Sequence, residues 1–334
     1  MSEKEIHFID PLISSQFVVN AAKHVSIKDQ GIQRLAQMLK SEIETKRYST
    51  SVWKEHPLHP KVADQTTIDW IFVVDSLNFS FWANTDQDYT IEGHTGYWAL
   101  CAAINRAIKK GIPITDPQFY SQVSEPEFRE IFSTDNGIEI PLLLKRLEVL
   151  RESGRVLIEK FGSSFLNCIQ ESDSKATNLL KLIVNNFSSF RDQTIYRGQR
   201  VSFYKRAQIL IADIWAAFEG NGFADFQDID ELTMFADYRV PQVLVYFDAI
   251  EYSQQLNDIL KDENHLFKSG DEYEVEIRAA SIVAVHRITQ LIKTMNNSSI
   301  NSVIIDFYLW DYRRENSQPI DEKTPFHRVR DIFY

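Results

Sequence analysis

The chain has little that could support covalent cross-links: only two of its 334 residues are cysteine. Cys101 and Cys168 lie far apart in apolar stretches, which is typical of buried, reduced thiols. No hydrophobic run approaches the roughly 20 residues of a membrane-spanning helix, and the polar N-terminal stretch lacks an apolar segment of signal-peptide length. We therefore expect an intracellular protein, with the cytoplasm as the first expectation and the nucleus as the alternative.

Basic charge is also scarce, because 36 lysines and arginines stand against 47 acidic residues and leave a net charge of −11. A surface with that field repels a phosphate backbone instead of releasing its counterions. Stable binding to duplex nucleic acid is therefore not expected, although a local basic site for a single phosphate is compatible with this composition.

Several short motifs are absent, namely GxGxxG, GxxxxGK[ST], CxxC, HExxH and GxSxG. The usual marks of dinucleotide, nucleoside triphosphate, structural zinc, zincin and α/β-hydrolase chemistry are therefore missing. His56 and His59 lie in the stretch HPLHP, where the prolines prevent a helical pair and no third ligand is near. We expect no metal here, and a loop or substrate-contact role for a histidine.

What the sequence does contain is helical periodicity, which predicts a mainly α fold. The predicted helices span 31–46, 96–110, 140–161, 174–187, 202–219, 241–261, 271–295 and 300–314. A small β element is predicted near residues 67–92, with 67–74 as the strand and 89–92 as its partner. Since no repeat or long linker is present, we expect a single domain over residues 1–334, for which two lobes around a central cleft are one arrangement.

Three stretches place charged or amide side chains among aromatic residues: 71–82, 234–244 and 303–314. Such surroundings suit a planar heterocycle, which stacks on the rings while its edge forms hydrogen bonds. A core with satisfied polar groups is the alternative. Asp237 precedes Pro241, and a helix beginning there would favour its ionised form.

Asp306 lies in the middle of the apolar helical stretch VIIDFYLWDYRR, where burial of an unpaired charge is strongly unfavourable. Two interpretations stay open: an ion pair with Lys205, Arg206, Arg278 or another basic residue, and a catalytic carboxylate. The basic stretch YRGQRVSFYKR likewise has two readings, since its four cations near a helix start suit either a phosphate site or a solvated face.

Six blocks of the chain resemble the queuosine salvage protein family, also described as queuosine 5′-phosphate N-glycosylase/hydrolase. They are DWIFVVDSLNFSFW, GYWALCAAINRAIKKGIPITDP, RVSFYKRAQILIADIW, TMFADYRVPQVL, INSVIIDFYLWDYRR and PFHRVRDIFY. The resemblance implies an enzyme that hydrolyses the N-glycosidic bond of queuosine 5′-monophosphate and releases queuine for tRNA. It also implies a helical fold related to helix-hairpin-helix DNA glycosylases, without a metal or organic cofactor.

The resemblance further implies site residues, with Asp306 as nucleophile or transition-state stabiliser. The family's site falls on His56, Phe235, Asp237, Asp306, Phe307 and Asp311. The HPLHP loop is one residue shorter than the family pattern, which leaves His56 and His59 as alternatives, and Phe307 replaces the more usual tyrosine.

The chemistry of the substrate explains why carboxylates would be needed. Queuine is a 7-deazaguanine and lacks the N7 whose protonation helps an ordinary purine to leave, so we expect stabilisation of the oxocarbenium-like sugar by a fixed carboxylate. We expect Asp237 to act beside Asp306, at the base edge or the neighbouring ribose, with Phe235 as a stacking face. Asp311 and His56 would contact the remaining sugar hydroxyls or the cyclopentenediol, and Lys205 or a nearby arginine would hold the 5′-phosphate.

Two further functions stay open at this stage. A non-catalytic carrier of queuine or a nucleotide would use the same aromatic surroundings, and a glycosylase acting on polymeric nucleic acid would need a long basic face. The oligomeric state does not follow from the sequence.

Overall fold

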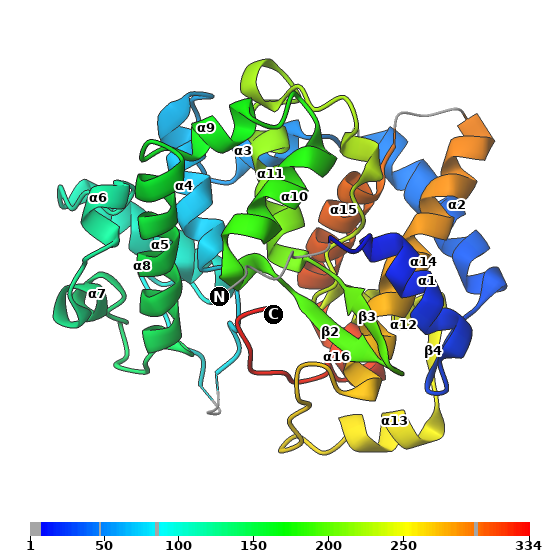
Figure 1. The fold of residues 1–334 in the computed structure, drawn as a ribbon. Helices are drawn as coiled ribbons and strands as arrows, with labels where there is room; N and C mark the ends of the chain where they lie inside the picture. Colours follow the sequence, from blue (N-terminus) through cyan, green and yellow to red (C-terminus); the bar gives the residue numbers. More distant parts are fainter. Residues whose placement is uncertain (1–7, 47, 84–86, 297–299) are drawn as a thin grey trace.

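A computed structural model describes residues 8–46, 48–83, 87–296 and 300–334, and α-helices dominate it (Figure 1). The helices are α1 (Pro11–Ala21), α2 (Asp29–Lys46), α3 (Ser51–Glu55), α4 (Gln65–Ser76), α5 (Gly96–Lys109), α6 (Pro117–Tyr120), α7 (Glu125–Ile131), α8 (Leu143–Lys160), α9 (Phe165–Gln170), α10 (Ala176–Asn186), α11 (Lys205–Ala217), α12 (Val240–Tyr246), α13 (Gln254–Leu260), α14 (Glu272–Asn296), α15 (Ser302–Glu315) and α16 (Ser317–Lys323). The predicted mainly α fold is confirmed. No helix among the described residues is long and apolar enough to cross a bilayer.

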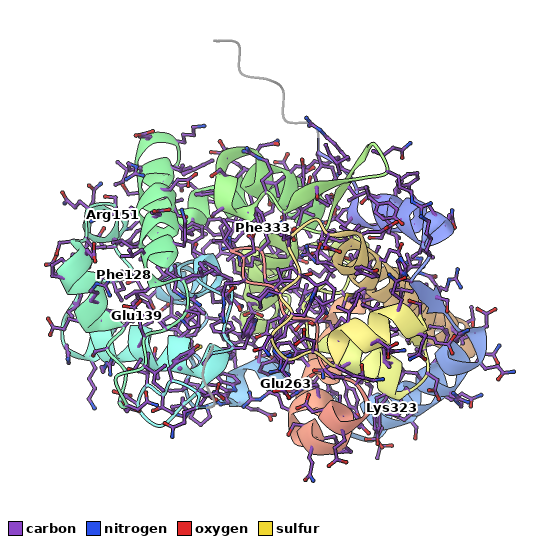
Figure 2. All side chains as sticks on the ribbon, turned by 90° about the horizontal axis from the view of Figure 1, so that it is seen from below. Phe128, Glu139, Arg151, Glu263, Lys323 and Phe333 are labelled. Atoms are coloured by element: carbon purple, nitrogen blue, oxygen red, sulfur yellow. The ribbon has the colours of Figure 1, made fainter. Side chains whose placement is uncertain are left out.

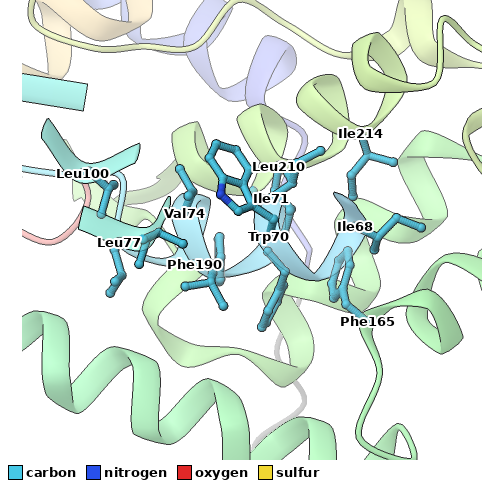
Figure 3. Packing of buried hydrophobic residues seen from close by; sticks show 14 of the residues in the cluster. Ile68, Trp70, Ile71, Val74, Leu77, Leu100, Phe165, Phe190, Leu210 and Ile214 are labelled. Carbon is cyan, nitrogen blue, oxygen red and sulfur yellow. The ribbon is translucent and has the colours of Figure 1, made fainter. Parts of the chain in front are cut away.

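The strand predicted over 67–74 is wrong, because these residues form most of α4. The helix begins after Asp64, whose side chain accepts a hydrogen bond from the Thr67 backbone N–H at 3.2 Å. Figure 3 shows the reason for the error: Ile68 lies against Phe165 and Ile214, and α4 is surrounded by other elements. A helix buried on nearly all sides shows no polar face, so its β-branched residues suggested a strand.

The strands lie elsewhere and form two short antiparallel pairs. β1 (Val25–Ile27) pairs with β4 (Ile250–Tyr252), and β2 (Gln193–Tyr196) pairs with β3 (Gln199–Ser202). The predicted partner strand at 89–92 contributes only an isolated bridge between Ile91 and His94.

The single helix predicted over 241–261 is also wrong, since α12, β4 and α13 share this stretch. Asp248 adopts a left-handed conformation with φ of 56°, which ends the helical path after α12. Ser253 then caps α13 by accepting a hydrogen bond from the Leu256 backbone N–H at 3.2 Å.

The buried apolar side chains form two cores, which we call the first core and the second core. The first core gathers around α4, α5, α8 and α11, and the second gathers around α2, α12, α14 and α15. Phe235 belongs to the first core, whereas its neighbours Met234 and Ala236 belong to the second. Residues 234–237 therefore run along the boundary between the cores, while a cleft at that boundary stays a prediction.

The C-terminal segment crosses the middle of the molecule and contacts both cores. Figure 2 shows Phe333 between Arg151 and Phe128 on one side and Lys323 on the other. The Ser80 backbone N–H donates to the Tyr334 carbonyl oxygen, and the Tyr334 hydroxyl donates to Glu274 of α14 at 2.5 Å. The segment thus joins the loop after α4 to α14.

Candidate active site

Asp306 lies in the second turn of α15 and is only 4% exposed. The helix begins after Asn301, whose side chain accepts a hydrogen bond from the Ile304 backbone N–H at 3.0 Å. This start directs Asp306 toward residues 234–237, where its Oδ1 accepts a hydrogen bond from the Phe235 backbone N–H at 2.9 Å. Burial raises the pKa of Asp306 well above its usual range, and the charge of Asp237 raises it further.

The ion pair considered for Asp306 is absent among the described residues. Arg278 instead pairs with Asp192 and Glu274, and Arg206 donates to the carbonyl oxygens of other residues. Asp306 is therefore a buried carboxyl group without a bonded cation. Such surroundings shift the group toward its protonated form.

Asp237 interacts with Asp306 through its charge but has different surroundings. Its Oδ1 accepts hydrogen bonds from the backbone N–H groups of Arg239 at 3.0 Å and Val240 at 2.8 Å, where α12 begins. Burial raises the pKa of Asp237, while Lys205 and these two N–H groups oppose the rise. Asp237 is thus the member of the pair that is more easily ionised.

Lys205 is the first residue of α11 and is 5% exposed. Its ammonium group lies 3.4 Å from the Asn78 carbonyl oxygen, and it lowers the pKa of both Asp237 and Asp306. Burial lowers the pKa of Lys205 itself to about 8, which keeps the ammonium form dominant at neutral pH.

The four predicted cations do not form one cluster. Lys205 and Arg206 are buried at the start of α11, whereas Arg197 and Arg200 lie on the exposed β2–β3 hairpin. Arg197 is paired there with Glu272 at 3.4 Å. Only Lys205 of this group therefore lies beside the two aspartates.

Aromatic rings lie next to this group. The centroids of Phe235 and Phe307 are 6.0 Å apart, with their planes tilted by 56°, and Phe307 is partly exposed. Phe307, Trp310, Asp311 and Arg314 share one face of α15 with Asp306, since their spacing follows the helical repeat.

Asp311 lies further along that face and has a partner that the sequence did not reveal. Its Oδ2 accepts a hydrogen bond from the Tyr48 hydroxyl at 2.5 Å. Burial raises the pKa of Asp311, while Tyr48 and Arg314 oppose the rise. Tyr48 comes from the segment after α2, more than 250 residues away in sequence, so no local pattern could indicate it.

The two histidines differ in their burial and in the contacts that their rings make. The ring nitrogens of His59 contact the Trp53 carbonyl oxygen at 2.7 Å and the Tyr97 hydroxyl at 2.9 Å, and the ring is buried. His56 is half-buried and stacks on Trp98 with centroids 3.2 Å apart. Burial lowers its pKa to about 4, so the ring is neutral at pH 7.

Trp98 connects His56 to α15. The Arg314 guanidinium carbon lies 5.2 Å from the Trp98 ring centroid and 4.8 Å from that of Trp310. His56 therefore belongs to the same group of rings as the exposed side of α15, whereas His59 is a bonded core residue. This favours His56 over His59 as the site histidine.

Two more buried carboxyl groups, Asp75 of α4 and Asp213 of α11, were missed as candidates. Burial raises the pKa of Asp75 to about 7, and burial together with Asp75 raises that of Asp213 well above its usual range. Both lie in apolar stretches, VVDSL and LIADIW, so the signal that found Asp306 is present in each. Within the described part of the chain, no group of three or more metal-ligating side chains is placed to hold a metal ion.

Comparison with known proteins adds to this geometry. The family model described as "Queuosine salvage protein" matches residues 58–334. The chain belongs to this family. Its predicted membership is thereby confirmed over most of the sequence.

Curated relatives share nearly their whole length with the chain. A Mus musculus protein named queuosine 5′-phosphate N-glycosylase/hydrolase is 45% identical over 339 residues, which cover 98% of this chain and 99% of the relative. Proteins with the same name from Schizosaccharomyces pombe and Sphaerobacter thermophilus are 38% and 34% identical, and each alignment covers 97% of this chain and at least 97% of the relative. The match extends from animal to bacterial members of the family.

Proposed function

We propose that the chain hydrolyses the N-glycosidic bond of queuosine 5′-monophosphate and releases queuine. The observation that carries the proposal is the pair Asp237 and Asp306, two buried carboxyl groups with unlike surroundings beside one lysine. Glycoside hydrolysis commonly requires two carboxyl groups, one protonated and one ionised, and unlike surroundings separate their pKa values. The name shared by the relatives supports the same reaction.

The surroundings of the two aspartates favour a division of roles. Asp237 receives two backbone N–H groups and lies near Lys205, so it suits the ionised group facing the anomeric carbon. Its fixed negative charge would stabilise the oxocarbenium-like sugar as the bond to the base breaks. The sequence placed Asp306 in that position, and the hydrogen bonds favour exchanging the two.

Asp306 would then act on the base. Its raised pKa favours a protonated carboxyl group, which can donate a proton to the leaving base as the electron pair of the broken bond moves to the ring. Water adds to the anomeric carbon, and the proton it releases restores the acid. This assistance matters because a 7-deazaguanine has no N7 to protonate.

The remaining side chains would bind the substrate. Phe235 and Phe307 offer ring faces to the base, and Asp311 and His56 lie on the same side of α15 for the sugar or cyclopentenediol hydroxyls. Lys205 would hold the 5′-phosphate as a point charge. No step requires a metal or organic cofactor. A relation to helix-hairpin-helix glycosylases is part of this proposal and is supported by the helical fold.

The deciding experiment incubates the protein with queuosine 5′-monophosphate and follows free queuine by chromatography. We expect queuine to accumulate in proportion to enzyme and time. No queuine above a control without enzyme would contradict the proposal, and tight substrate binding without turnover would instead support a carrier. Tight binding to duplex DNA with a steep salt dependence would support a glycosylase of polymeric nucleic acid.

A further inference from the structure

Arg278 of α14 connects two parts of the site without lying in it. Its side chain is 1% exposed, and its Nε donates to the Ala236 carbonyl oxygen at 2.9 Å. Ala236 lies between Phe235 and Asp237, so this bond holds the backbone from which both side chains project. The guanidinium plane also lies over the rings of Phe203 and Tyr334.

The Nη groups of the same guanidinium connect, through Asp192, to the start of α11. Its two Nη atoms donate to the two carboxylate oxygens of Asp192 at 3.0 and 2.5 Å. Asp192 Oδ2 also accepts a hydrogen bond from the Lys205 backbone N–H at 3.2 Å. One rigid group therefore bonds the loop that carries Asp237 and the carboxylate that anchors Lys205.

The contacts of Arg278 are unusually complete for a buried charge. Glu274 accepts a hydrogen bond from it at 3.2 Å, and Glu274 in turn accepts bonds from the Tyr334 hydroxyl and the Gly270 backbone N–H. Buried ion pairs of this kind add little net stability over apolar side chains of similar volume, because desolvation offsets the attraction. A role in fixing geometry accounts better for such a group than a role in stability.

We propose that Arg278 is a positioning residue that sets the placement of Asp237 relative to Lys205. The inference rests on the proposed function of those two residues. Only a planar guanidinium can bond Ala236 and both oxygens of Asp192 together, because a lysine ammonium is a single point with no fixed fork. Arg278→Lys would therefore keep the charge and lose the geometry.

The test measures kcat and KM for queuosine 5′-monophosphate with wild-type protein and Arg278→Lys. We expect kcat/KM to fall about 10- to 100-fold, because misplacing a catalytic group by about 1 Å can cost about 10²-fold in rate. We expect kcat to fall and KM to rise, since Asp237 serves the reaction and Lys205 serves binding. An unchanged kcat/KM in a folded Arg278→Lys protein would overturn the inference.

Glu276→Gln is the matched control, since Glu276 is equally buried on the same helix. Its carboxylate accepts hydrogen bonds from backbone N–H groups at the start of β1 and from the Tyr196 hydroxyl at 2.8 Å, all outside the site. We expect Glu276→Gln to lower the melting temperature while kcat/KM stays within about twofold, since no contact to Asp237 or Lys205 changes. A loss of kcat/KM as large as that of Arg278→Lys would show a general stability effect and overturn the inference.

A double-mutant cycle shows whether Arg278 acts through Lys205. In a Lys205→Met background, Arg278→Lys should cost less than in the wild type, because one of the groups it positions is gone. Losses that simply multiply would contradict the inference. Should Arg278→Lys not accumulate as folded protein, Asp192→Asn takes its place in the same cycle. An inactive wild type would refute the proposed function itself. An active wild type together with an unchanged kcat/KM in Arg278→Lys would refute only this inference.

Discussion

The charge of Lys205 acts on members of two pairs of buried carboxyl groups, and the pairs differ in what fixes them. In the pair Asp75 and Asp213, Oδ1 of Asp75 accepts a hydrogen bond from the Asn78 side-chain amide at 3.0 Å. Its Oδ2 has no hydrogen-bond partner among the described residues. In the pair Asp237 and Asp306, backbone N–H groups bond both members. Backbone donors cannot rotate away, so they fix the direction of a carboxylate more firmly than a side-chain amide can.

The two pairs also differ in their access to a ligand. Asp75 is fully buried within the first core, whereas Asp306 shares its helix face with the partly exposed Phe307 and Asp311. Burial and like charges raise the pKa of carboxyl groups in both pairs. A perturbed pKa is therefore a property of burial, and the proposed site is distinguished by fixed orientation together with partly exposed neighbours.

The largest expected effect is a difference in kcat between variants of the two carboxyl pairs. Asp237→Asn removes the charge proposed to face the sugar and should lower kcat about 10³-fold, the size expected for losing one fixed electrostatic contact in a site. Asp75→Asn should change kcat only severalfold. Single-turnover assays with queuosine 5′-monophosphate measure both, and a larger loss for Asp75→Asn would reverse the comparison.

Asp306→Asn sharpens the same contrast inside the active pair. We expect it to lower kcat as well and to abolish the high-pH limb that reports loss of the acid's proton, because an amide does not titrate. If Asp306→Asn keeps a wild-type pH profile, the acid role belongs elsewhere.

A smaller effect concerns Lys205, whose charge acts on carboxyl groups of both pairs. Its ammonium group is charged below its pKa of about 8, so kcat/KM for the 5′-monophosphate should fall as the pH rises through about 8. Lys205→Arg should move this fall to higher pH, because a guanidinium stays charged. Lys205→Met should lower kcat/KM about 10- to 100-fold at pH 7, since a hydrogen bond to a charged group contributes about 1.5–3 kcal/mol. Lys205→Arg, which keeps the charge beside Asp237 and Asp306, should act weakly on a substrate without the phosphate.

The smallest expected effect concerns stability and isolates Asp75. Its pKa is about 7 in the folded protein and near 4 when unfolded, so the folded state binds the extra proton between these values. Its contribution to stability is therefore complete below pH 4 and is lost as the pH rises through 7. Asn does not titrate, so Asp75→Asn should remove that loss. Its melting temperature should exceed that of the wild type by a few degrees more at pH 8 than at pH 5. Thermal unfolding of both proteins at the two pH values measures the difference.

The sequence predicted those parts of the fold whose signal is local. The helix over 300–314 and its embedded Asp306 could be read because an acid interrupts an apolar helical pattern, and α15 occupies nearly that range. The stretch 67–74 could not be assigned, since a helix enclosed by other elements carries no polar face. The end of α12 escaped prediction because a left-handed Asp248 gives no periodic signal.

The site residues stay a prediction, and the sequence indicated their identity more than their arrangement. The resemblance to a family supplied the positions, and embedded acids supplied a physical reason for two of them. The partners of those acids come from distant segments: Tyr48 reaches Asp311, and Arg278 reaches the loop before Asp237. Such long-range contacts depend on packing, which periodicity and spacing do not specify.

The contacts of Trp98 with His56 and with Arg314 also have a spectroscopic consequence. Indole emission responds to nearby charge and to exclusion of water, and Trp310 lies 6.1 Å from Trp98 between ring centroids. A ligand that displaces His56 or Arg314 would change the environment of both indoles at once. Intrinsic fluorescence, with Trp98→Phe to identify the source, would therefore report occupancy of the site by unlabelled ligands.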